Sequence, residues 1–387
     1  MASMSLFRIG SALLVAVTIL YGIHYFIWVR LGRDPAISPA WSRAIAAALA
    51  VLCACVVLGF VAHRLPRFPR VLVASVSWVG FTWLGVAFLL IVGLAFGDLV
   101  RLFVGIAARM LSDTVPDVDR RRALARILAG AAGTFAVVMA GAGLRGALGR
   151  PAIKTVKIAL RRWPAHLSGY TIVQLSDIHV GPTIGREFIE SIVATVNALS
   201  PDLVVITGDL VDGSVAELGR SVSPLADLRA RDGVFFVLGN HEYYSGAKEW
   251  IRHLPTLGIR VLVNERVSVA GLAGFDLAGV DDPTGAPDMA RTLADRDSDR
   301  AVVLLAHQPR AVFDASKLGV DLQLSGHTHG GQIFPFHVLV GLQQPYVSGL
   351  HDHHGTAVYV SRGTGYWGPA MRIGAPAEIT RIELRRS

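Results

Sequence analysis

The pattern of apolar and polar residues divides the chain into two parts. Up to about residue 150, long apolar stretches are interrupted by arginines, and beyond it short apolar runs alternate with amphipathic helical patterns. A helix that crosses the bilayer core needs about 20 mostly apolar residues. Residues 1–150 are therefore predicted to be a membrane region with about four transmembrane helices, at Leu6–Val29, Ala44–Ala62, Val71–Gly97 and Ala123–Leu144.

The first apolar stretch is predicted to be a retained helix rather than a cleaved signal peptide. Only one Arg, Arg8, lies at its N-terminal end, and no small-residue cleavage pattern occurs before Arg30. The chain is thus expected to be a multi-pass protein of the cell membrane. Ten basic residues flank one side of the four spans and nine flank the other, so the positive-inside rule leaves the side of the second part open.

Composition supports a membrane region. Apolar residues make up 52% of the chain and charged residues 17%, and the mean hydropathy of +0.48 is too high for one soluble domain. The net charge of +8 is distributed unevenly between the two parts. Residues 1–150 contain 15 Arg and 5 Asp, whereas residues 151–387 contain 22 basic and 24 acidic residues. Because the second part lacks a basic stripe, no nucleic-acid partner is expected. The two cysteines, Cys53 and Cys55, cannot frame a disulfide-dependent fold.

The second part has the alternation of strands and helices that is typical of an α/β layout. Amphipathic spacing predicts helices over Arg186–Leu199 and Ala247–Leu257. We expect one domain over residues 151–387, joined to the membrane region through Gly149–Pro164. The predicted strands are Thr171–Leu175, Leu203–Thr207, Val234–Leu238, Phe275–Val280, Ala301–Ala306, Leu322–Ser325, Ala357–Ser361 and Ile379–Leu384.

Five of these strands are followed by residues that can bind metals. Ligands bind outside the carboxyl ends of strands in open α/β sheets, so these side chains are expected to meet in one crevice. Carboxylate, imidazole and amide groups without thiolates suit Mn, Fe or Zn, and the set is too large for one ion, which indicates two divalent metal ions. Glycines next to Asp209, Asn240 and His327 would let the backbone turn sharply and approach the ions closely. The candidate residues are Asp177, His179, Asp209, Asn240, His241, His307, His327 and His329.

In these residues the sequence resembles the calcineurin-like metallophosphoesterase superfamily, whose motifs are D-x-H, G-D, G-N-H-[ED], H and G-H-x-H in this order. All five motifs are present between Asp177 and His329. The surrounding sequence is most similar to the YkuE/YaeI-type branch and to transmembrane proteins with a metallophosphoesterase domain. The resemblance implies a four-layer α/β (α+β) sandwich, with two mixed sheets flanked by helices.

The resemblance also implies a role for each candidate. Asp177, His179, Asp209 and His329 would hold one metal, and Asp209, Asn240, His307 and His327 the other, with Asp209 bridging. His241 would be the catalytic residue, which meets the phosphate and protonates the leaving oxygen, while a metal-bridging hydroxide is the nucleophile.

Several other residues have two interpretations. Asp212 either orients the metal ligands or is a surface loop residue. Glu242 either orients a metal-bound histidine or is a charge at the start of a helix. Asp281 and Asp282 either belong to a turn or contact the site. The run His351–His354 is read as a solvated loop or a substrate-facing lid. Arg362 and Arg372 are surface residues or clamps for a phosphate group.

The sequence thus predicts an integral membrane phosphoesterase with two metal ions. Its partners would be the lipid bilayer and a phosphomonoester, phosphodiester or pyrophosphate. Because the resemblance includes enzymes of lipid-linked diphosphates, an amphiphilic substrate such as a nucleotide-diphospholipid is the first expectation. Two rival hypotheses are a non-catalytic membrane scaffold with a structural metal site and a transport or signalling protein with a regulatory metal domain.

Overall fold

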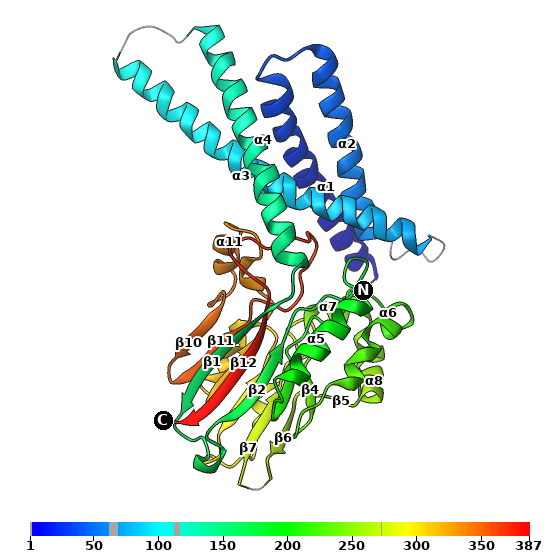
Figure 1. The fold of residues 1–387 in the computed structure, drawn as a ribbon, viewed down its shortest axis with the longest axis vertical. Coiled ribbons are helices and arrows are strands. Elements are labelled where there is room, and N and C mark those ends of the chain that lie inside the picture. The colour runs from blue at the N-terminus through cyan, green and yellow to red at the C-terminus, as the bar shows by residue number, and fades with distance from the viewer. Residues whose placement is uncertain (1, 62–68, 112–116, 272) are drawn as a thin grey trace. The chain divides into compact units, whose positions relative to one another are not determined.

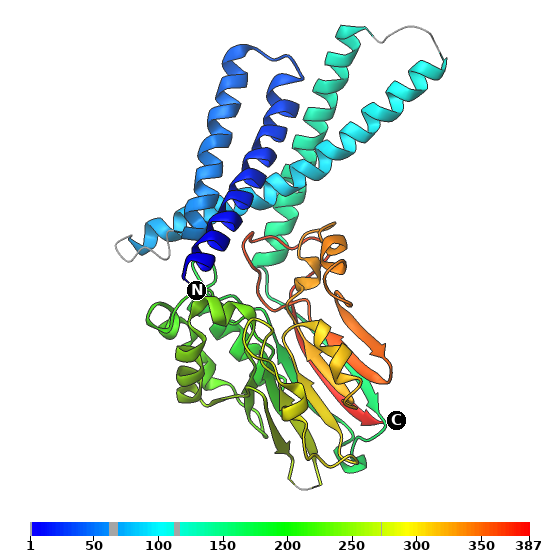
Figure 2. The ribbon, with the colours of Figure 1, turned by 180° about the vertical axis from the view of Figure 1, so that it is seen from behind.

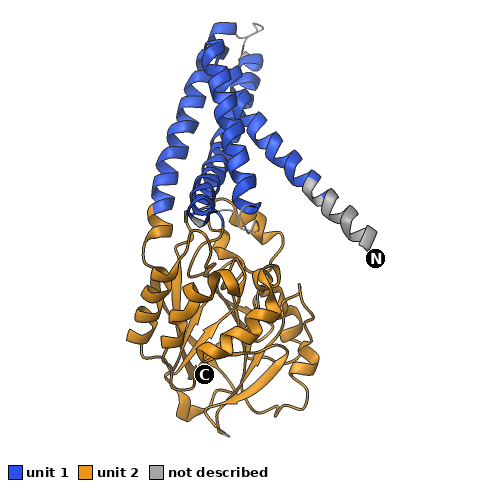
Figure 3. Ribbon diagram, turned by 90° about the vertical axis from the view of Figure 1, so that its right-hand side faces the viewer, with its two compact units in different colours: residues 1–144, 368–370 blue, residues 145–367, 371–387 orange. Residues whose placement is uncertain are grey.

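The computed structural model describes residues 2–61, 69–111, 117–271 and 273–387. Two compact units are formed, the first by Met1–Leu144 with Gly368–Ala370 and the second by Arg145–Trp367 with Met371–Ser387 (Figure 3). Three residues used in the analysis of the spans, Ala62, Arg64 and Arg67, lie outside the described residues.

The first unit consists of long apolar helices, and four of its helical segments are long and apolar enough to cross a membrane. α3 continues beyond the predicted span because Arg101 and Arg109 are good helix formers and do not end a helix. Asp98 therefore lies inside α3, where it is 2.8 Å from Arg30. The helices are α1 (Ala2–Trp28, followed by a π-helical turn, Val29–Arg33), α2 (Pro39–Val61), α3 (Arg70–Leu111) and α4 (Val118–Leu148).

The second unit contains two six-stranded mixed sheets (Figure 1). The first sheet has the order β1-β12-β2-β3-β4-β5 and the second β10-β11-β9-β8-β7-β6. The strands β2 to β5 are parallel to one another, as are β7, β8, β9 and β11. The strands are β1 (Ala152–Leu160), β2 (Tyr170–Leu175), β3 (Leu203–Ile206), β4 (Val234–Phe236), β5 (Ile259–Val261), β6 (Glu265–Val269), β7 (Phe275–Gly279), β8 (Val302–Leu305), β9 (Leu322–Ser325), β10 (Gly349–His353), β11 (Thr356–Val360) and β12 (Glu378–Arg386).

Helices cover the outer faces of both sheets, which confirms the expected fold class. Figure 1 shows α5 and α8 beside the first sheet, and Figure 2 shows short helices against the second sheet from behind. The helices of this unit are α5 (Arg186–Ala198), α6 (Val215–Val222), α7 (Asn240–Ser245), α8 (Ala247–His253), α9 (Met289–Thr292), α10 (Val312–Ala315) and α11 (His337–Gly341).

The layers follow from the alternation of side chains along buried strands. In β3, Val204 and Ile206 face the core under α5 and α8, whereas Leu203 and Val205 face the core between the sheets. Strands that are buried on both faces must be apolar throughout, and this continuous apolar run is what made them recognisable in the sequence.

The prediction that residues 149–164 form a connector is wrong for most of this segment, because Ala152–Leu160 forms β1. This strand pairs in parallel with β12 at the edge of the first sheet. Its exposed positions include Thr155 and Lys157, and an edge strand that is partly exposed has a weaker apolar pattern than a central strand.

We predict that a fragment from Arg145 to Ser387 folds on its own, whereas a fragment that starts at Arg161 does not. The shorter fragment lacks β1, whose Ile158 and Leu160 are buried between the sheets. Burying one such side chain contributes about 1.5–3 kcal/mol, and a domain is stable by only about 5–15 kcal/mol. Urea unfolding monitored by circular dichroism would compare the two; equal midpoints would contradict the prediction.

Candidate metal centre

The predicted ligands stand on sharp turns that follow the strands. Five of them have left-handed backbone conformations, with φ between 50° and 70°. Asp and His adopt this region more readily than most residues, but it still costs free energy, and such strain gathers at functional sites that the surrounding structure holds in place. These five residues are Asp177, His179, Asp209, His327 and His329.

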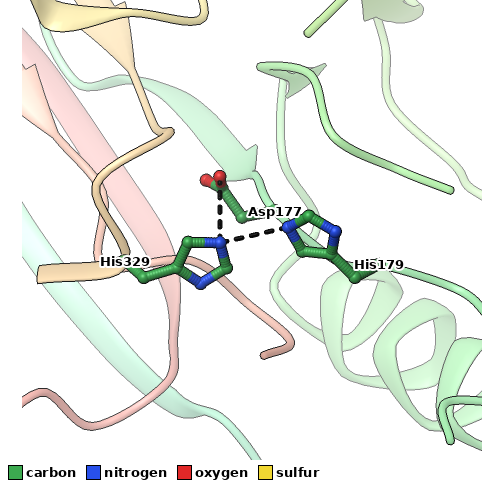
Figure 4. A group of neighbouring side chains, drawn as sticks. All are labelled: Asp177, His179 and His329. Atoms are coloured by element: carbon green, nitrogen blue, oxygen red, sulfur yellow. Dashed lines mark hydrogen bonds and ion pairs between the residues drawn. The ribbon is translucent and has the colours of Figure 1, made fainter. Parts of the chain in front are cut away.

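One cluster joins Asp177, His179 and His329 (Figure 4). The Nε2 atoms of His179 and His329 are 3.1 Å apart, and His329 Nε2 is 3.5 Å from Asp177 Oδ1. Asp177 and His179 follow β2 in the first sheet, whereas His329 follows β9 in the second. Both sheets therefore supply this cluster.

A second cluster joins Asp209, His307 and His327. The Nδ1 atom of His307 is 2.7 Å from the Thr207 carbonyl oxygen, so this ring directs Nε2 towards the cluster. That Nε2 lies 3.0 Å from Asp209 Oδ2 and 3.2 Å from Nδ1 of His327. Each cluster thus has one carboxylate and two imidazoles.

Asp209 lies between the two clusters. Its Oδ2 atom is 3.0 Å from His307 of the second cluster and 3.9 Å from Nε2 of His179 in the first. Its other oxygen, Oδ1, accepts a hydrogen bond of 2.9 Å from the main-chain N–H of His241. The Asp209 carboxylate is therefore fixed in orientation and close to both groups.

Two buried oxygen atoms support a cation at this place. Among the residues that the structure describes, Asp177 Oδ2 and Asn240 Oδ1 accept no hydrogen bond. A buried polar atom without a partner costs about 1–3 kcal/mol, and coordination of a metal ion would remove that cost. The donor set of carboxylate, amide and imidazole fits divalent Mn, Fe or Zn.

Two glycines leave room for the carboxylates. A Cβ atom on Gly239 would lie 2.2 Å from Asp209 Oδ1, and one on Gly326 would lie 2.2 Å from Asp177 Oδ2. Any other residue would displace these oxygens. The backbone at the glycines beside Asn240 and His327 thus comes close to the carboxylates that are predicted to hold the ions.

The electrostatic environment gives three of the predicted ligands the protonation states that bind metals. Burial would raise the pKa of Asp209, but the adjacent His307 lowers it well below its usual value. Burial and then the charge of His307 lower the pKa of His327 to about 3. Burial, together with His179 and Arg372, holds the pKa of His329 well below its usual range. Metal ligation requires ionised carboxylates and neutral imidazoles, which these three shifts provide.

Two other predicted ligands are shifted in the opposite direction. Burial raises the pKa of Asp177. Burial would lower the pKa of His307, but Asp209 raises it to about 10. A metal ion would therefore compete with protons for these two groups.

The Asp212 carboxylate contacts both His179 of the first cluster and His241. Its Oδ1 atom is 3.0 Å from Nδ1 of His179 and 2.6 Å from Nδ1 of His241. Burial would lower the pKa of His241, but Asp212 and Asp209 raise it to about 9. Of the two interpretations of Asp212, the structure supports orientation of the site and not a surface loop.

Glu242 holds the loop that carries Asp209. Its buried carboxylate accepts hydrogen bonds from the main-chain N–H groups of Gly239, Asp209 and Leu210, at 2.7, 3.0 and 2.8 Å. It therefore contacts the backbone of the ligand loops rather than a metal-cluster histidine.

Arg372 is neither a surface residue nor a phosphate clamp. Its side chain is buried and donates to the carbonyl oxygens of Gly365, His329 and Ala375 at 2.9, 3.2 and 3.0 Å. It positions the loop of His329, which the sequence did not reveal because the two residues are 43 positions apart. Arg362 is partly exposed and lies 4.0 Å from Glu378 Oε2.

The remaining candidates lie outside the two clusters. Asp281 accepts hydrogen bonds from Tyr243 and from the main chain of Ala286, and Asp282 accepts one from Thr284, which is turn chemistry. The interpretation of His351–His354 as a loop is wrong for its first three residues, which belong to the edge strand β10. Their alternating half-exposed pattern is that of an edge strand, which the polar residues concealed.

Comparison with known proteins agrees with this geometry. The family model of the calcineurin-like phosphoesterases matches residues 170–331, a range that contains both clusters. A transmembrane protein with metallophosphoesterase domain from Bos taurus is 37% identical over 411 residues, which cover 98% of this chain and 90% of that protein.

Two bacterial relatives match the second part of the chain. An uncharacterized metallophosphoesterase of Campylobacter jejuni is 42% identical over 63% of this chain, which spans 66% of that relative's length. The uncharacterized metallophosphoesterase YkuE of Bacillus subtilis is 35% identical over 57% of this chain and 81% of its own length. The motifs, the two-sheet fold and these relatives together establish that the chain belongs to the calcineurin-like metallophosphoesterase family.

Proposed function

We propose that this protein is an integral membrane phosphoesterase that holds two divalent metal ions. Asp177, His179, Asp209 and His329 would hold one ion. Asp209, Asn240, His307 and His327 would hold the other. The bond that it hydrolyses would be that of a phosphomonoester, a phosphodiester or a pyrophosphate.

The position of Asp209 is the observation that carries the proposal. Its Oδ2 atom is within 4 Å of one imidazole from each cluster, as a carboxylate shared by two ions requires. Two ions bound there would act as Lewis acids and lower the pKa of a water molecule towards neutrality.

His241 is proposed as the residue that protonates the leaving oxygen. Asp212 engages its Nδ1 atom, so Nε2 is the ring nitrogen that would meet a substrate. The His241 main-chain N–H donates a hydrogen bond to Asp209, and this bond holds His241 beside the clusters. Asp212 would hold the ring in orientation and stabilise its charged form.

The membrane part of the proposal rests on the four apolar helices and on the transmembrane relative. We propose a multi-pass protein of the cell membrane whose catalytic domain lies at the bilayer. An amphiphilic substrate, such as a lipid-linked or nucleotide-diphospholipid compound, fits this location.

An activity panel tests the proposed function. The purified full-length chain in detergent would be assayed on phosphomonoesters, phosphodiesters and pyrophosphates with Mn, Fe, Zn or Mg. We expect hydrolysis of at least one class that stops on chelation and returns with metal. No hydrolysis by a protein that binds two ions would favour the scaffold hypothesis.

One prediction from this proposal concerns metal content. Asp209→Ala should lose both ions, because Asp209 is shared, whereas His307→Ala should weaken only one. Elemental analysis after dialysis would measure this, with Asp227→Ala as a control that removes an exposed carboxylate. Two full equivalents in Asp209→Ala would rule out the shared role.

A further prediction concerns His241. His241→Ala should retain both ions but lose about 10²- to 10⁴-fold in rate, as is typical when a general acid is removed. The loss should be smaller for nitrophenyl esters than for alkyl esters, because nitrophenolate leaves without a proton. Equal losses for both ester types would contradict this role.

A further inference from the structure

An uncharged stretch with exposed apolar side chains lies next to the metal centre. No Asp, Glu, Lys or Arg occurs between Leu322 and His351. Within this stretch, residues 334–342, here called the apolar rim, include the short helix α11. Five of these nine residues are large, apolar and exposed by 45–82%: Phe334, Phe336, Val338, Leu339 and Leu342.

The apolar rim is connected to His241 through Trp367. The Gln332 side chain, two residues before the rim, accepts a hydrogen bond from the Trp367 main-chain N–H and donates one to its carbonyl oxygen, at 3.0 and 2.9 Å. The Trp367 ring is 43% exposed and its centroid lies 5.6 Å from that of His241. The rim therefore adjoins the side of the site where a leaving group would be protonated.

The chain enters this unit at the same end. Arg145–Leu148, the last turn of α4, belongs to the unit that carries the metal centre. A Cβ atom on Gly146 would lie 2.8 Å from the Arg372 carbonyl oxygen, and the Arg372 side chain bonds the His329 main chain. Only residues 149–151 separate α4 from β1. The His329 loop is thus connected through Arg372 to the last turn of α4, and this helix is long and apolar enough to cross a membrane.

A bilayer is the occupant that these properties favour. Charged side chains are costly in the bilayer, whereas Trp, Phe and Leu are common at its interface. Contiguous apolar patches on soluble surfaces are usually small unless they bind something. A stretch of 30 residues without Asp, Glu, Lys or Arg, in a unit that begins with the last turn of a helix of membrane-spanning length, matches the chemistry of lipid.

We propose that the apolar rim inserts into the interface of the bilayer. The mouth of the site beside Trp367 and His241 would then be presented to phosphoesters of amphiphilic molecules in that bilayer. This second step rests on the proposed function, whereas insertion of the rim does not.

Fluorescence quenching tests insertion directly. The full-length chain, with Cys53 and Cys55 replaced by Ala, would carry Leu342→Cys or the control Phe313→Cys, each labelled with a polarity-sensitive fluorophore. Leu342 is 82% exposed in the rim, and Phe313 is 47% exposed on α10. In phosphatidylcholine vesicles, we expect doxyl-labelled lipid to remove most emission at 342 and little at 313, and iodide to show the opposite preference.

Two results would overturn the proposal. Quenching by iodide at 342 as strong as at 313 would place the rim in water. Protection of 342 from both quenchers would mean that protein covers the rim. Neither readout depends on activity, so failure of the proposed function is seen separately.

The substrate step is tested with two nitrophenyl phosphodiesters, one with a hexadecyl and one with an ethyl group. In the same vesicles, the double variant Val338→Ser/Leu342→Ser should hydrolyse the hexadecyl ester about tenfold more slowly and the ethyl ester at the wild-type rate. Phe313→Ser should match the wild type on both. An unchanged rate on the hexadecyl ester, or an equal loss of rate on both esters, would contradict the role of the rim. If the wild type hydrolysed neither ester nor any other phosphoester, the proposed function would be contradicted instead.

Discussion

Packing of the two sheets against each other is the constraint on which the metal centre depends. Side chains such as Ile172 and Val205 of one sheet share a buried core with Val303 and Leu324 of the other. This packing sets the carboxyl ends of β2, β3 and β4 opposite those of β8 and β9. The His327 main-chain N–H donates to Asp177 Oδ1 at 2.9 Å across the sheets, so the two halves of the site are also bonded directly.

The backbone of the site is strained, and buried polar contacts hold it in place. Five ligand residues have left-handed φ values, which unsupported loops would relax. Glu242 holds the Asp209 loop, and Arg372 holds the His329 loop, each through several main-chain hydrogen bonds. These contacts arrange the ligand loops, which reduces the ordering cost of binding a metal ion.

The sequence predicted the centre of this structure better than its edges. The eight predicted strands are all present, because each carries a run of apolar residues. β1, β5, β6 and β10 were missed, since all four are the edge strands of the two sheets and edge strands have a weaker apolar pattern. The motifs identified the ligand candidates, but the roles of Asp212 and Arg372 depend on contacts between residues 29 to 43 positions apart, which only the fold brings together.

Anomalous diffraction from crystals of the manganese-loaded protein tests whether Asp209 joins two metal ions. Two peaks about 3.5–4 Å apart, the spacing of two-metal sites, are expected. One should lie beside Asp177, His179 and His329, and the other beside His307 and His327, with Asp209 contacting both. A single peak, or a pair of peaks of which Asp209 contacts only one, would contradict this role of Asp209.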